Sequence, residues 1–513
     1  MVTKDEKKKL ISEIIAYWSK DWNKFVRDAL CARLDREQQA IIESVQHNPM
    51  TAVASGTARG KDFVAACASL CFMYLTPRFN EKGVLVGNTK VAMTAPTGRQ
   101  VKNIMTPEIR RLIRAARAKF PFCCPGRLVA DDIRTDYEEW FLTGFKADDN
   151  ATESWSGFHA ANTMFVVTEA SGISEIVYNA IEGNLQGNSR MLIVFNPNIT
   201  TGYAARAMKS ERFAKFRLSS LNAENVVKKQ VIIPGQVDYE WVKDKVINWC
   251  SPIQQTDFNE GEGDFNWEGS LYRPNDLFRV KVLGMFPKVS EDVLIPYEWI
   301  EIANWNWQEL QADGFIPAKS CKLGVDVAGM GRDNSVLCPR YGNYVPQFKV
   351  HQSSGRADHM HVVGMTVPYL KKKGAKAFID TIGEGAGVYS RLLEEEFTNA
   401  FSCKYSEGAD GLHDITGEYE FANMRAYLYW ALRDWLNPKN GFGAALPPCD
   451  QLMEEATETK WKFLSNGKII IEPKEDVKKR IKRSPDYMDA LANTFYPRDY
   501  SFISDEELLK DFL

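Results

Sequence analysis

Four short apolar segments between residues 50 and 200 restrict the possible folds of this chain more than any other feature. They are 51–56, 91–96, 163–170 and 191–198, each ends in small or polar residues, and helical patterns lie between several of them. Apolar strands that alternate with helices are typical of β-α units in a parallel sheet. The pattern therefore predicts an α/β domain whose strand ends meet at one edge, where open α/β sheets bind their ligands.

Composition excludes several other classes of protein. The 513 residues are 44% hydrophobic and 26% charged, which is ordinary for globular domains. No apolar run reaches the length of a membrane span, and the N-terminus lacks the apolar core of a signal peptide. With 64 basic and 67 acidic residues, any surface that binds nucleic acid must be a local patch. Ten scattered cysteines and only six histidines indicate free thiols in a reducing compartment and argue against a structural zinc site.

A glycine-containing turn follows the first apolar segment and opens a helical stretch. Residues 55–62 read Ser-Gly-Thr-Ala-Arg-Gly-Lys-Asp. In a phosphate-binding loop, glycines let backbone N–H groups turn toward the phosphates, and a lysine reaches the β and γ oxygens. Gly56, Gly60 and Lys61 fit this pattern, although Ser55 stands where the first glycine is usual. A plain helix start after a glycine-rich turn is the alternative interpretation.

The ends of two later strands indicate ATP hydrolysis. Glu169 follows the apolar strand 164–168, in the position where a carboxylate orients the attacking water. Asn196 ends the apolar run 192–195 and is suited to sensing the γ-phosphate. Each run taken singly is better explained as a plain core strand. The ordered set, with polar groups at every strand end, predicts an ATPase.

Two positions depart from the usual phosphate-loop pattern. Such ATPases hold Mg²⁺ with a hydroxyl residue after the lysine and an aspartate before the catalytic glutamate. Here these positions carry Asp62 and Thr168, so the carboxylate and the hydroxyl have changed places. Our hypothesis is that the Mg²⁺ shell keeps one group of each kind, supplied from opposite sides. The alternative is an enzyme that binds Mg²⁺ loosely and hydrolyses ATP weakly.

A second α/β block begins near residue 321 and carries aspartates at its strand ends. Asp326 and Asp380 end predicted strands, and Asp486 and Asp489 lie one helical turn apart. Such carboxylates suit two Mg²⁺ or Mn²⁺ ions about 4 Å apart, which together promote phosphodiester cleavage. Hard oxygen ligands favour these ions over zinc. For Asp486 and Asp489, a favourable charge at a helix start after Ser-Pro is the alternative.

Three further features of this block allow two interpretations. Asp333 and Glu384 could be additional metal ligands or ordinary turn residues. The basic run 478–483 could hold a DNA backbone, or it could be a solvated helix end.

In combination these segments resemble the large terminase subunit of tailed bacteriophages. The likeness extends from residues 35–46 to residues 484–496. Its most specific parts are 94–105, the interval from 166 to 198, 284–287 and 484–491.

The resemblance implies a fold and a division into domains. It implies a P-loop (ASCE-type) ATPase with a parallel sheet over residues 1–225, and an ATPase subdomain with a linker over 226–312. An RNase H-like nuclease domain is expected over 313–498, followed by an acidic tail, 499–513, that could dock on the portal. Such a protein hydrolyses ATP to move double-stranded DNA into a procapsid and cuts concatemeric DNA by two-metal catalysis.

The resemblance also assigns roles to single residues of the ATPase. It implies that Lys61 binds phosphate, that Arg59 acts in cis on the γ-phosphate, and that Glu169 is the catalytic carboxylate. Gln38 corresponds to the glutamine near the adenine, and Asn196 lies in the coupling motif.

The nuclease acids and the partners follow from the same resemblance. Asp326, Asp380 and Asp486 match the nuclease acids, and Asp489 is a further candidate metal ligand. The implied cofactors are ATP, Mg²⁺ and Mn²⁺. The implied partners are double-stranded DNA, a small terminase subunit, the portal protein and further copies of the chain in a ring, in the host cytoplasm and transiently on the procapsid, without a membrane.

Two other functions are compatible with these motifs. A helicase or repair ATPase with a nuclease domain would need a second motor domain, for which residues 225–310 are too few. A weakly catalytic DNA-binding assembly protein would agree with the altered metal positions, Asp62 and Thr168.

Overall fold

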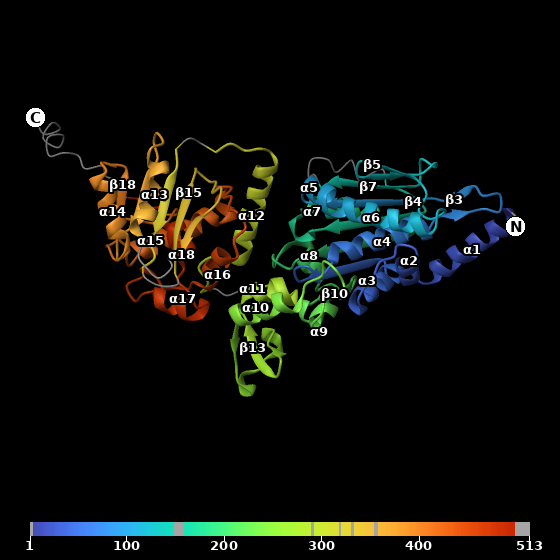
Figure 1. Ribbon diagram of the computed structural model, residues 1–513, viewed down its shortest axis with the longest axis horizontal. Coiled ribbons are helices and arrows are strands. Elements are labelled where there is room, and N and C mark those ends of the chain that lie inside the picture. Colours follow the sequence, from blue (N-terminus) through green and yellow to red (C-terminus); the bar gives the residue numbers. More distant parts are fainter. Residues whose placement is uncertain are drawn as a thin grey trace, which may run out of the picture. The chain divides into compact units, whose positions relative to one another are not determined.

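The computed structural model describes residues 4–147, 158–288, 292–317, 320–329, 333–352 and 358–497. The chain forms two compact units, Met1–Pro287 and Lys288–Leu513 (Figure 1). The predicted intermediate segment, 226–312, is divided between them, and the predicted acidic tail lies outside the described residues. None of the helices within the described ranges combines the length and the apolar character that a membrane crossing requires.

The first unit is built on an eight-stranded sheet in the order β10-β1-β9-β8-β4-β7-β6-β5. The six strands from β10 to β7 are parallel, and β6 and β5 extend the sheet in antiparallel fashion. Because β9 lies between β1 and β8, the strand before the phosphate loop and the strand before Glu169 are not neighbours. This is the arrangement of an ASCE-type P-loop ATPase, as the sequence predicted. The strands are β1 (Met50–Ser55), β4 (Thr89–Ala95), β5 (Arg127–Val129), β6 (Asp132–Arg134), β7 (Phe141–Lys146), β8 (Asn162–Thr168), β9 (Asn188–Phe195) and β10 (Ala214–Leu218).

Helices cover both faces of this sheet, which explains why its central strands are buried along most of their length. Val53 and Val166 face one core, whereas Ala54 and Val167 face the other. The first core is closed by α1 (Lys4–Lys20), α2 (Trp22–Asp28), α3 (Arg36–His47), α4 (Lys61–Leu75) and α6 (Thr106–Lys119). The second core is closed by α7 (Glu175–Glu182) and α8 (Gly202–Ala207).

The remaining elements of the first unit are short. A three-stranded antiparallel sheet, β11-β13-β12, follows the main sheet in the chain. These elements are β2 (Arg78–Phe79), β3 (Leu85–Gly87), α5 (Gly98–Gln100), η1 (Val101–Met105), η3 (Ala170–Gly172), η4 (Ser220–Asn222), α9 (Glu224–Val227), α10 (Tyr239–Trp249), β11 (Cys250–Pro252), η5 (Gln255–Asp257), η6 (Glu260–Glu262), β12 (Phe265–Trp267), β13 (Ser270–Pro274), α11 (Asp276–Phe278) and η7 (Arg279–Leu283).

The second unit contains a five-stranded sheet in the order β16-β15-β14-β17-β18. The pairs β14–β15 and β15–β16 are antiparallel, and β14–β17 and β17–β18 are parallel. This order with these directions is RNase H-like, so the predicted fold class is confirmed for both units. The strands are β14 (Lys322–Asp326), β15 (Asn334–Arg340), β16 (Lys349–Gln352), β17 (Lys376–Asp380) and β18 (Ala400–Cys403), with a hairpin of β19 (Trp461–Phe463) and β20 (Ile469–Ile471).

One face of the second sheet packs on α13 and α14, and the other receives α18. Gly324 in β14 allows α18 to lie directly on the strand, because a Cβ there would be 1.8 Å from the backbone oxygen of Ala490. The helices of this unit are α12 (Tyr297–Ala312), α13 (His359–Leu370), α14 (Gly385–Glu394), α15 (Met424–Leu436), η8 (Pro438–Asn440), α16 (Asp450–Glu458), α17 (Lys474–Ile481) and α18 (Asp486–Asn493).

Candidate functional site

The loop between β1 and α4 has the features of an anion site. Gly56 has no room for a side chain, because a Cβ there would be 2.7 Å from the backbone oxygen of Val282. Gly60 is left-handed, with φ of +79°, a conformation that glycine adopts without strain. Lys61 then begins α4, whose first N–H groups have no partner inside the helix and carry its positive dipole end.

Lys61, Asp62 and Glu169 come together at the end of this loop. The Lys61 Nζ lies 2.7 Å from Glu169 Oε1 and 3.1 Å from Asp62 Oδ2. Burial alone lowers the pKa of Lys61, but the two carboxylates outweigh burial and leave the pKa above its usual value. The lysine is therefore charged. Glu169 adopts a left-handed backbone, φ 47° and ψ 43°, which is strained for a glutamate.

Thr168 and Asn196 connect neighbouring strand ends around this cluster. The Thr168 hydroxyl is buried and donates a long, 3.5 Å hydrogen bond to the backbone oxygen of Thr94. Asn196 Nδ2 donates to the backbone oxygen of Ser55 at 2.7 Å, so the end of β9 is joined to the end of β1. All four predicted strand ends thus lie at one edge of the sheet.

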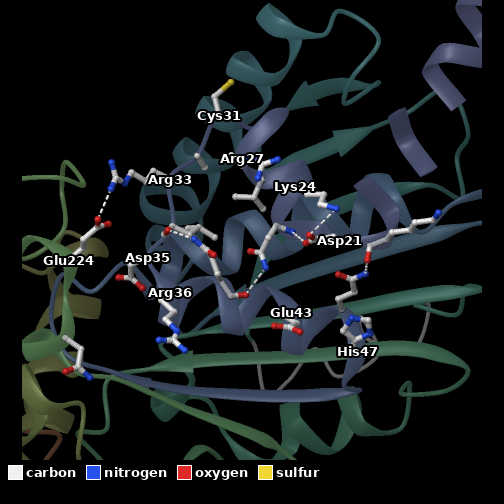
Figure 2. Close-up of a pocket in the computed structure, with 18 of the residues that line it drawn as sticks. Asp21, Lys24, Arg27, Cys31, Arg33, Asp35, Arg36, Glu43, His47 and Glu224 are labelled. Atoms are coloured by element: carbon white, nitrogen blue, oxygen red, sulfur yellow. Dashed lines mark hydrogen bonds and ion pairs between the residues drawn. The ribbon is translucent and has the colours of Figure 1, made fainter. Parts of the chain in front are cut away.

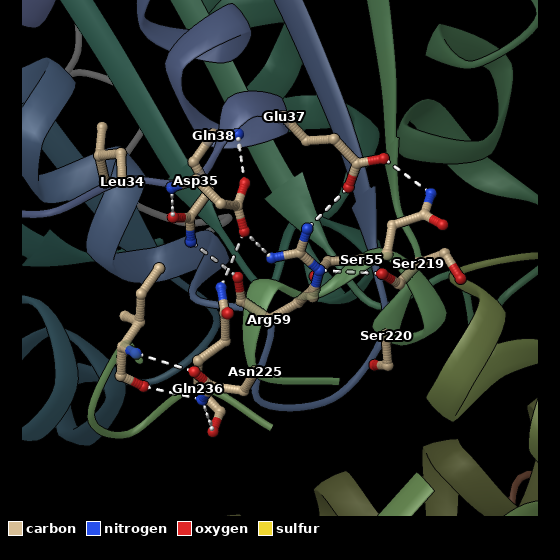
Figure 3. A network of polar contacts seen from close by, with 12 residues as sticks. Leu34, Asp35, Glu37, Gln38, Ser55, Arg59, Ser219, Ser220, Asn225 and Gln236 are labelled. Atoms are coloured by element: carbon tan, nitrogen blue, oxygen red, sulfur yellow. Dashed lines mark hydrogen bonds and ion pairs between the residues drawn. The ribbon is translucent and has the colours of Figure 1, made fainter. Parts of the chain in front are cut away.

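Arg59 lies in a different place from the one its predicted role requires. Its guanidinium is fully buried and donates to Asp35 at 2.5 Å, Glu37 at 2.7 Å and the backbone oxygen of Ser219 at 2.9 Å (Figure 3). The structure does not bring it to Lys61 and Glu169. The predicted action of Arg59 on a γ-phosphate does not fit this arrangement, because two carboxylates at the start of α3 already neutralise its charge.

Gln38 supports the same loop from α3. Its Nε2 donates to the backbone oxygen of Arg59 at 2.9 Å, and its Oε1 accepts from the backbone N–H of Asp35 at 3.0 Å (Figure 3). The second bond completes a capping box at the start of α3. Gln38 therefore fixes the position of the loop relative to α3. Its proximity to an adenine stays a prediction.

A cavity of about 1300 Å³ is lined in part by residues of α2 and α3 and includes Asp35 of this network (Figure 2). Its walls carry both signs of charge, and Arg33 closes one side through a 2.7 Å ion pair with Glu224. Neither Lys61 nor Glu169 lines it, so it is separate from the phosphate site. The charged lining residues are Lys20, Asp21, Lys24, Arg27, Arg33, Asp35, Arg36, Glu43, Lys119 and Glu224.

In the second unit, three predicted aspartates lie at one end of the RNase H-like sheet. Asp326 and Asp380 end the neighbouring parallel strands β14 and β17. Asp486 begins α18, and its Oδ2 accepts from the backbone N–H of Asn334 on β15 at 3.0 Å.

The pKa values of these aspartates reflect burial and the negative charge of neighbouring carboxylates. Burial raises the pKa of Asp380 and of Asp486 to about 6. Burial, with the repulsion from Asp489, Asp486 and Asp380, raises the pKa of Asp326 well above its usual range. Raised carboxylate pKa values at strand ends are typical of a site that receives cations.

Asp489 has different surroundings from the other three. It is fully buried, its Oδ1 accepts from the Tyr429 hydroxyl at 2.5 Å, and its Oδ2 lies 2.7 Å from Lys474 Nζ. Burial works against ionisation, but Lys474 and Arg425 outweigh it and hold the pKa of Asp489 below its usual value. The prediction that Asp489 is a metal ligand does not fit this arrangement, because its charge is already neutralised within the protein.

Lys474 is a site residue that the sequence did not reveal. Its side chain is half-buried, and its amine lies 2.7 Å from Asp489 Oδ2 and interacts with Asp326. Burial alone lowers its pKa, yet these two carboxylates raise it well above the usual value. In the sequence it is one lysine at the start of a helix that carries several, so no pattern distinguished it.

The remaining predicted features of this unit have protein partners. Asp333 binds Lys478 Nζ at 3.0 Å and the Ser484 hydroxyl at 3.1 Å. Glu384 Oε2 lies 2.8 Å from His359 Nε2, and its side chain lies against Gly329 in the loop after Asp326. In the basic run, Lys478, Lys479, Arg480 and Arg483 all form ion pairs with acidic residues. These pairs favour a structural role for the run over direct DNA binding.

Comparison with known proteins gives the following similarities. No family model matches the chain. A probable large terminase subunit of Enterobacteria phage P7 is 22% identical over 97% of this chain and 96% of that protein. A mutant nuclease domain of the large terminase subunit of bacterial virus Sf6, with manganese and beta-thujaplicinol, is 20% identical and covers 40% of this chain and all of that domain, with a TM-score of 0.34. The large terminase of the thermophilic bacteriophage D6E in complex with ADP is 10% identical over 90% of this chain and 98% of that one, with a TM-score of 0.36.

Proposed function

We propose that this chain, which is similar to a large terminase subunit over nearly its whole length, is the ATP-hydrolysing and DNA-cutting subunit of a viral DNA-packaging motor. The observation that carries the proposal is the presence of two separate sites in one chain. One is the contact of Lys61 with Glu169 at the strand ends of an ASCE-type sheet. The other is the group of three aspartates at one end of an RNase H-like sheet, of which Asp326 and Asp486 are buried and Asp380 is half-buried.

In the ATPase unit, we assign binding and chemistry to different groups. Lys61 and the N–H groups at the start of α4 hold the phosphates of ATP. A phosphate that takes the Lys61 amine releases the Glu169 carboxylate, which then orients the attacking water. The contact between Lys61 and Glu169 thus links nucleotide binding to the activation of the catalytic carboxylate.

Asp62 and Thr168 remain our proposal for the Mg²⁺ shell of the nucleotide. Asp62 lies beside Lys61, and the hydroxyl of Thr168 makes only a long hydrogen bond, which it could readily exchange for an ion. If Asp62→Ala leaves Mg²⁺-dependent ATP turnover at the level of the unaltered protein, this assignment is wrong.

In the nuclease unit, the residues that would hold two Mg²⁺ or Mn²⁺ ions are Asp326, Asp380 and Asp486. Their oxygen donors and their raised pKa values suit such ions, because divalent cations would relieve the mutual repulsion of the carboxylates. When bound, the ions would activate the attacking oxygen and stabilise the leaving oxygen of a phosphodiester. Lys474 keeps Asp489 neutralised and limits the negative charge beside Asp326.

The further partners follow from the same proposal. Double-stranded DNA is the substrate of both activities, while a small terminase subunit selects it. The portal of the procapsid is the docking point, and several copies of the chain act there as a ring, after assembly in the host cytoplasm.

Plasmid cleavage tests the nuclease assignment directly. We would incubate the purified protein with plasmid and Mn²⁺ or Mg²⁺, and compare it with Asp326→Ala and with the matched control Asp410→Ala, whose aspartate is exposed and pairs with Lys468. We expect metal-dependent cutting by the unaltered protein and the control, and none by Asp326→Ala. Equal cutting by all three would show that the site lies elsewhere or that a contaminant cuts.

ATP turnover tests the other half of the proposal. We expect Lys61→Ala to abolish DNA-stimulated ATP hydrolysis while it leaves plasmid cleavage intact. DNA binding without turnover or cleavage in the unaltered protein would favour the assembly-protein interpretation instead.

A further inference from the structure

A cluster of two histidines and one aspartate lies in the second unit, apart from the aspartates described above. His351 is on β16, Asp358 caps the N-terminus of α13, and His361 lies in the first turn of that helix. One ring nitrogen of each histidine and one oxygen of the aspartate all lie within 4.8 Å of one another. No sequence pattern indicates this cluster, because its residues lack the close spacing of a zinc motif.

The distances in the cluster suit a shared ion better than a direct contact. His351 Nε2 lies 3.6 Å from Asp358 Oδ2, which is too long for a hydrogen bond. Two ligands on a tetrahedral zinc ion, with bonds of about 2.0–2.1 Å, are separated by about 3.4 Å. His351 Nε2 is shielded from solvent and has no hydrogen-bond partner among the described residues.

The two imidazole rings of the cluster lie against each other. They are stacked, with centroids 3.9 Å apart and an angle of 22° between their planes. A bound ion lies in the plane of each imidazole ring that binds it, so the exposed His361 ring turns out of the stack when both rings hold one ion.

The backbone already orients the carboxylate. Asp358 Oδ1 accepts from the backbone N–H of His361 at 3.1 Å, which leaves Oδ2 directed at His351. His351 is itself fixed by the pairing of β16 with β15, opposite Ser335. Ligands held in this way by capping and strand pairing are typical of sites that bind metal tightly.

We propose that His351, Asp358 and His361 form a binding site for one transition-metal ion of the Zn²⁺ class, with water as the fourth ligand. Two imidazoles and one carboxylate favour such an ion over Mg²⁺ or Ca²⁺. The bound ion would join the edge strand β16 to the start of α13. This proposal is independent of the packaging function, because it uses none of the ATPase or nuclease residues.

Cobalt binding tests the site on the full chain without a histidine tag. After chelation and dialysis, the protein would be titrated with Co²⁺ in excess Mg²⁺, which occupies the all-oxygen sites. We expect one equivalent of Co²⁺ with the visible absorption of a tetrahedral complex, displaced by Zn²⁺. We expect His351→Ala and His361→Ala each to weaken binding at least tenfold, whereas the control His413→Ala binds as the unaltered protein does.

Two results would overturn the proposal. The first is a double variant, His351→Ala with His361→Ala, that binds Co²⁺ with unchanged affinity and spectrum. The second needs no variant: X-ray absorption of the zinc-loaded full chain in excess Mg²⁺ should show two imidazole ligands, and a shell of oxygen alone would exclude the site.

Discussion

At the scale of single residues, Glu169 combines backbone strain with a specific contact. A left-handed glutamate costs about 1–3 kcal/mol, and such strain persists where the surrounding structure holds it in place. Here the left-handed backbone of Glu169 directs the carboxylate at Lys61. Glu169→Gln keeps the shape of the side chain but removes the charge, so we expect ATP turnover to fall by about 10²–10⁴-fold with nucleotide binding retained. Steady-state hydrolysis and binding of a fluorescent ADP analogue would measure the two effects.

The matched control for this change is Glu175→Gln on α7. Glu175 is an exposed glutamate that pairs with Arg206. Its variant should turn over ATP at the rate of the unaltered protein. If Glu169→Gln did so as well, the catalytic carboxylate would have to be another residue.

Asp486 and Asp489 lie one helical turn apart and should respond differently to the same substitution. Asp489→Asn leaves the half-buried Lys474 amine without its charged partner, so we expect a loss of about 1–3 kcal/mol in the free energy of unfolding. Asp486→Asn removes a repelled charge, so we expect lost cleavage with little loss of stability. Denaturant unfolding and plasmid cleavage would separate the two effects. An Asp489→Asn protein of unaltered stability that cannot cut DNA would make Asp489 a metal ligand.

At the scale of elements, the meeting of β14, β17 and α18 should make stability depend on pH. Asp380 and Asp486 have pKa values of about 6 in the folded protein, above the ordinary value of 3.8. The folded state therefore holds more protons than the unfolded state between these values. The metal-free protein should lose stability as the pH rises through about 4 to 6, and Mn²⁺ should restore more stability at pH 7.5 than at pH 5.

Thermal midpoints at several pH values, with and without Mn²⁺, would measure this effect. Asp434 and Glu455 also have raised pKa values, about 6 and about 8, and add a dependence of the same sign. The unaltered protein must therefore be compared with the double variant Asp380→Asn and Asp486→Asn. This variant should lose the stabilisation by Mn²⁺ and keep the pH dependence that Asp434 and Glu455 cause. A Mn²⁺ stabilisation that is equal at all pH values would contradict the assignment.

The strands were predictable because burial on both faces makes them continuous apolar runs. The apolar segments of the sequence coincide with β1, β4, β8 and β9, and Asp326 and Asp380 were correctly expected at strand ends. The features that the sequence did not predict depend on contacts between elements that are distant in the sequence. No local pattern indicates that Arg59 pairs with carboxylates of α3, or that His351 lies beside His361.

At the scale of the whole molecule, the similarity to a large terminase subunit confirms the resemblance that the motifs indicated. The match extends over 97% of the chain, so it includes both compact units. Each unit also has its own hydrophobic core, formed in the first by the two faces of the large sheet and in the second by β14, β17, α13 and α14. Separate cores favour separate unfolding transitions.

Each ligand should therefore stabilise only the unit that binds it. In differential scanning calorimetry we expect two transitions, with Mg²⁺-ADP raising only the one that belongs to the first unit and Mn²⁺ alone raising the one that belongs to the second. At a hundredfold excess over the dissociation constant, each ligand adds about 2.7 kcal/mol to the unit that binds it, which raises its thermal midpoint by about 5–10 °C for domains of this size. Lys61→Ala should remove only the ADP shift, and Asp326→Ala only the Mn²⁺ shift. A single transition whose midpoint both ligands raise would contradict this prediction. It would mean that the two units unfold together although each has its own core.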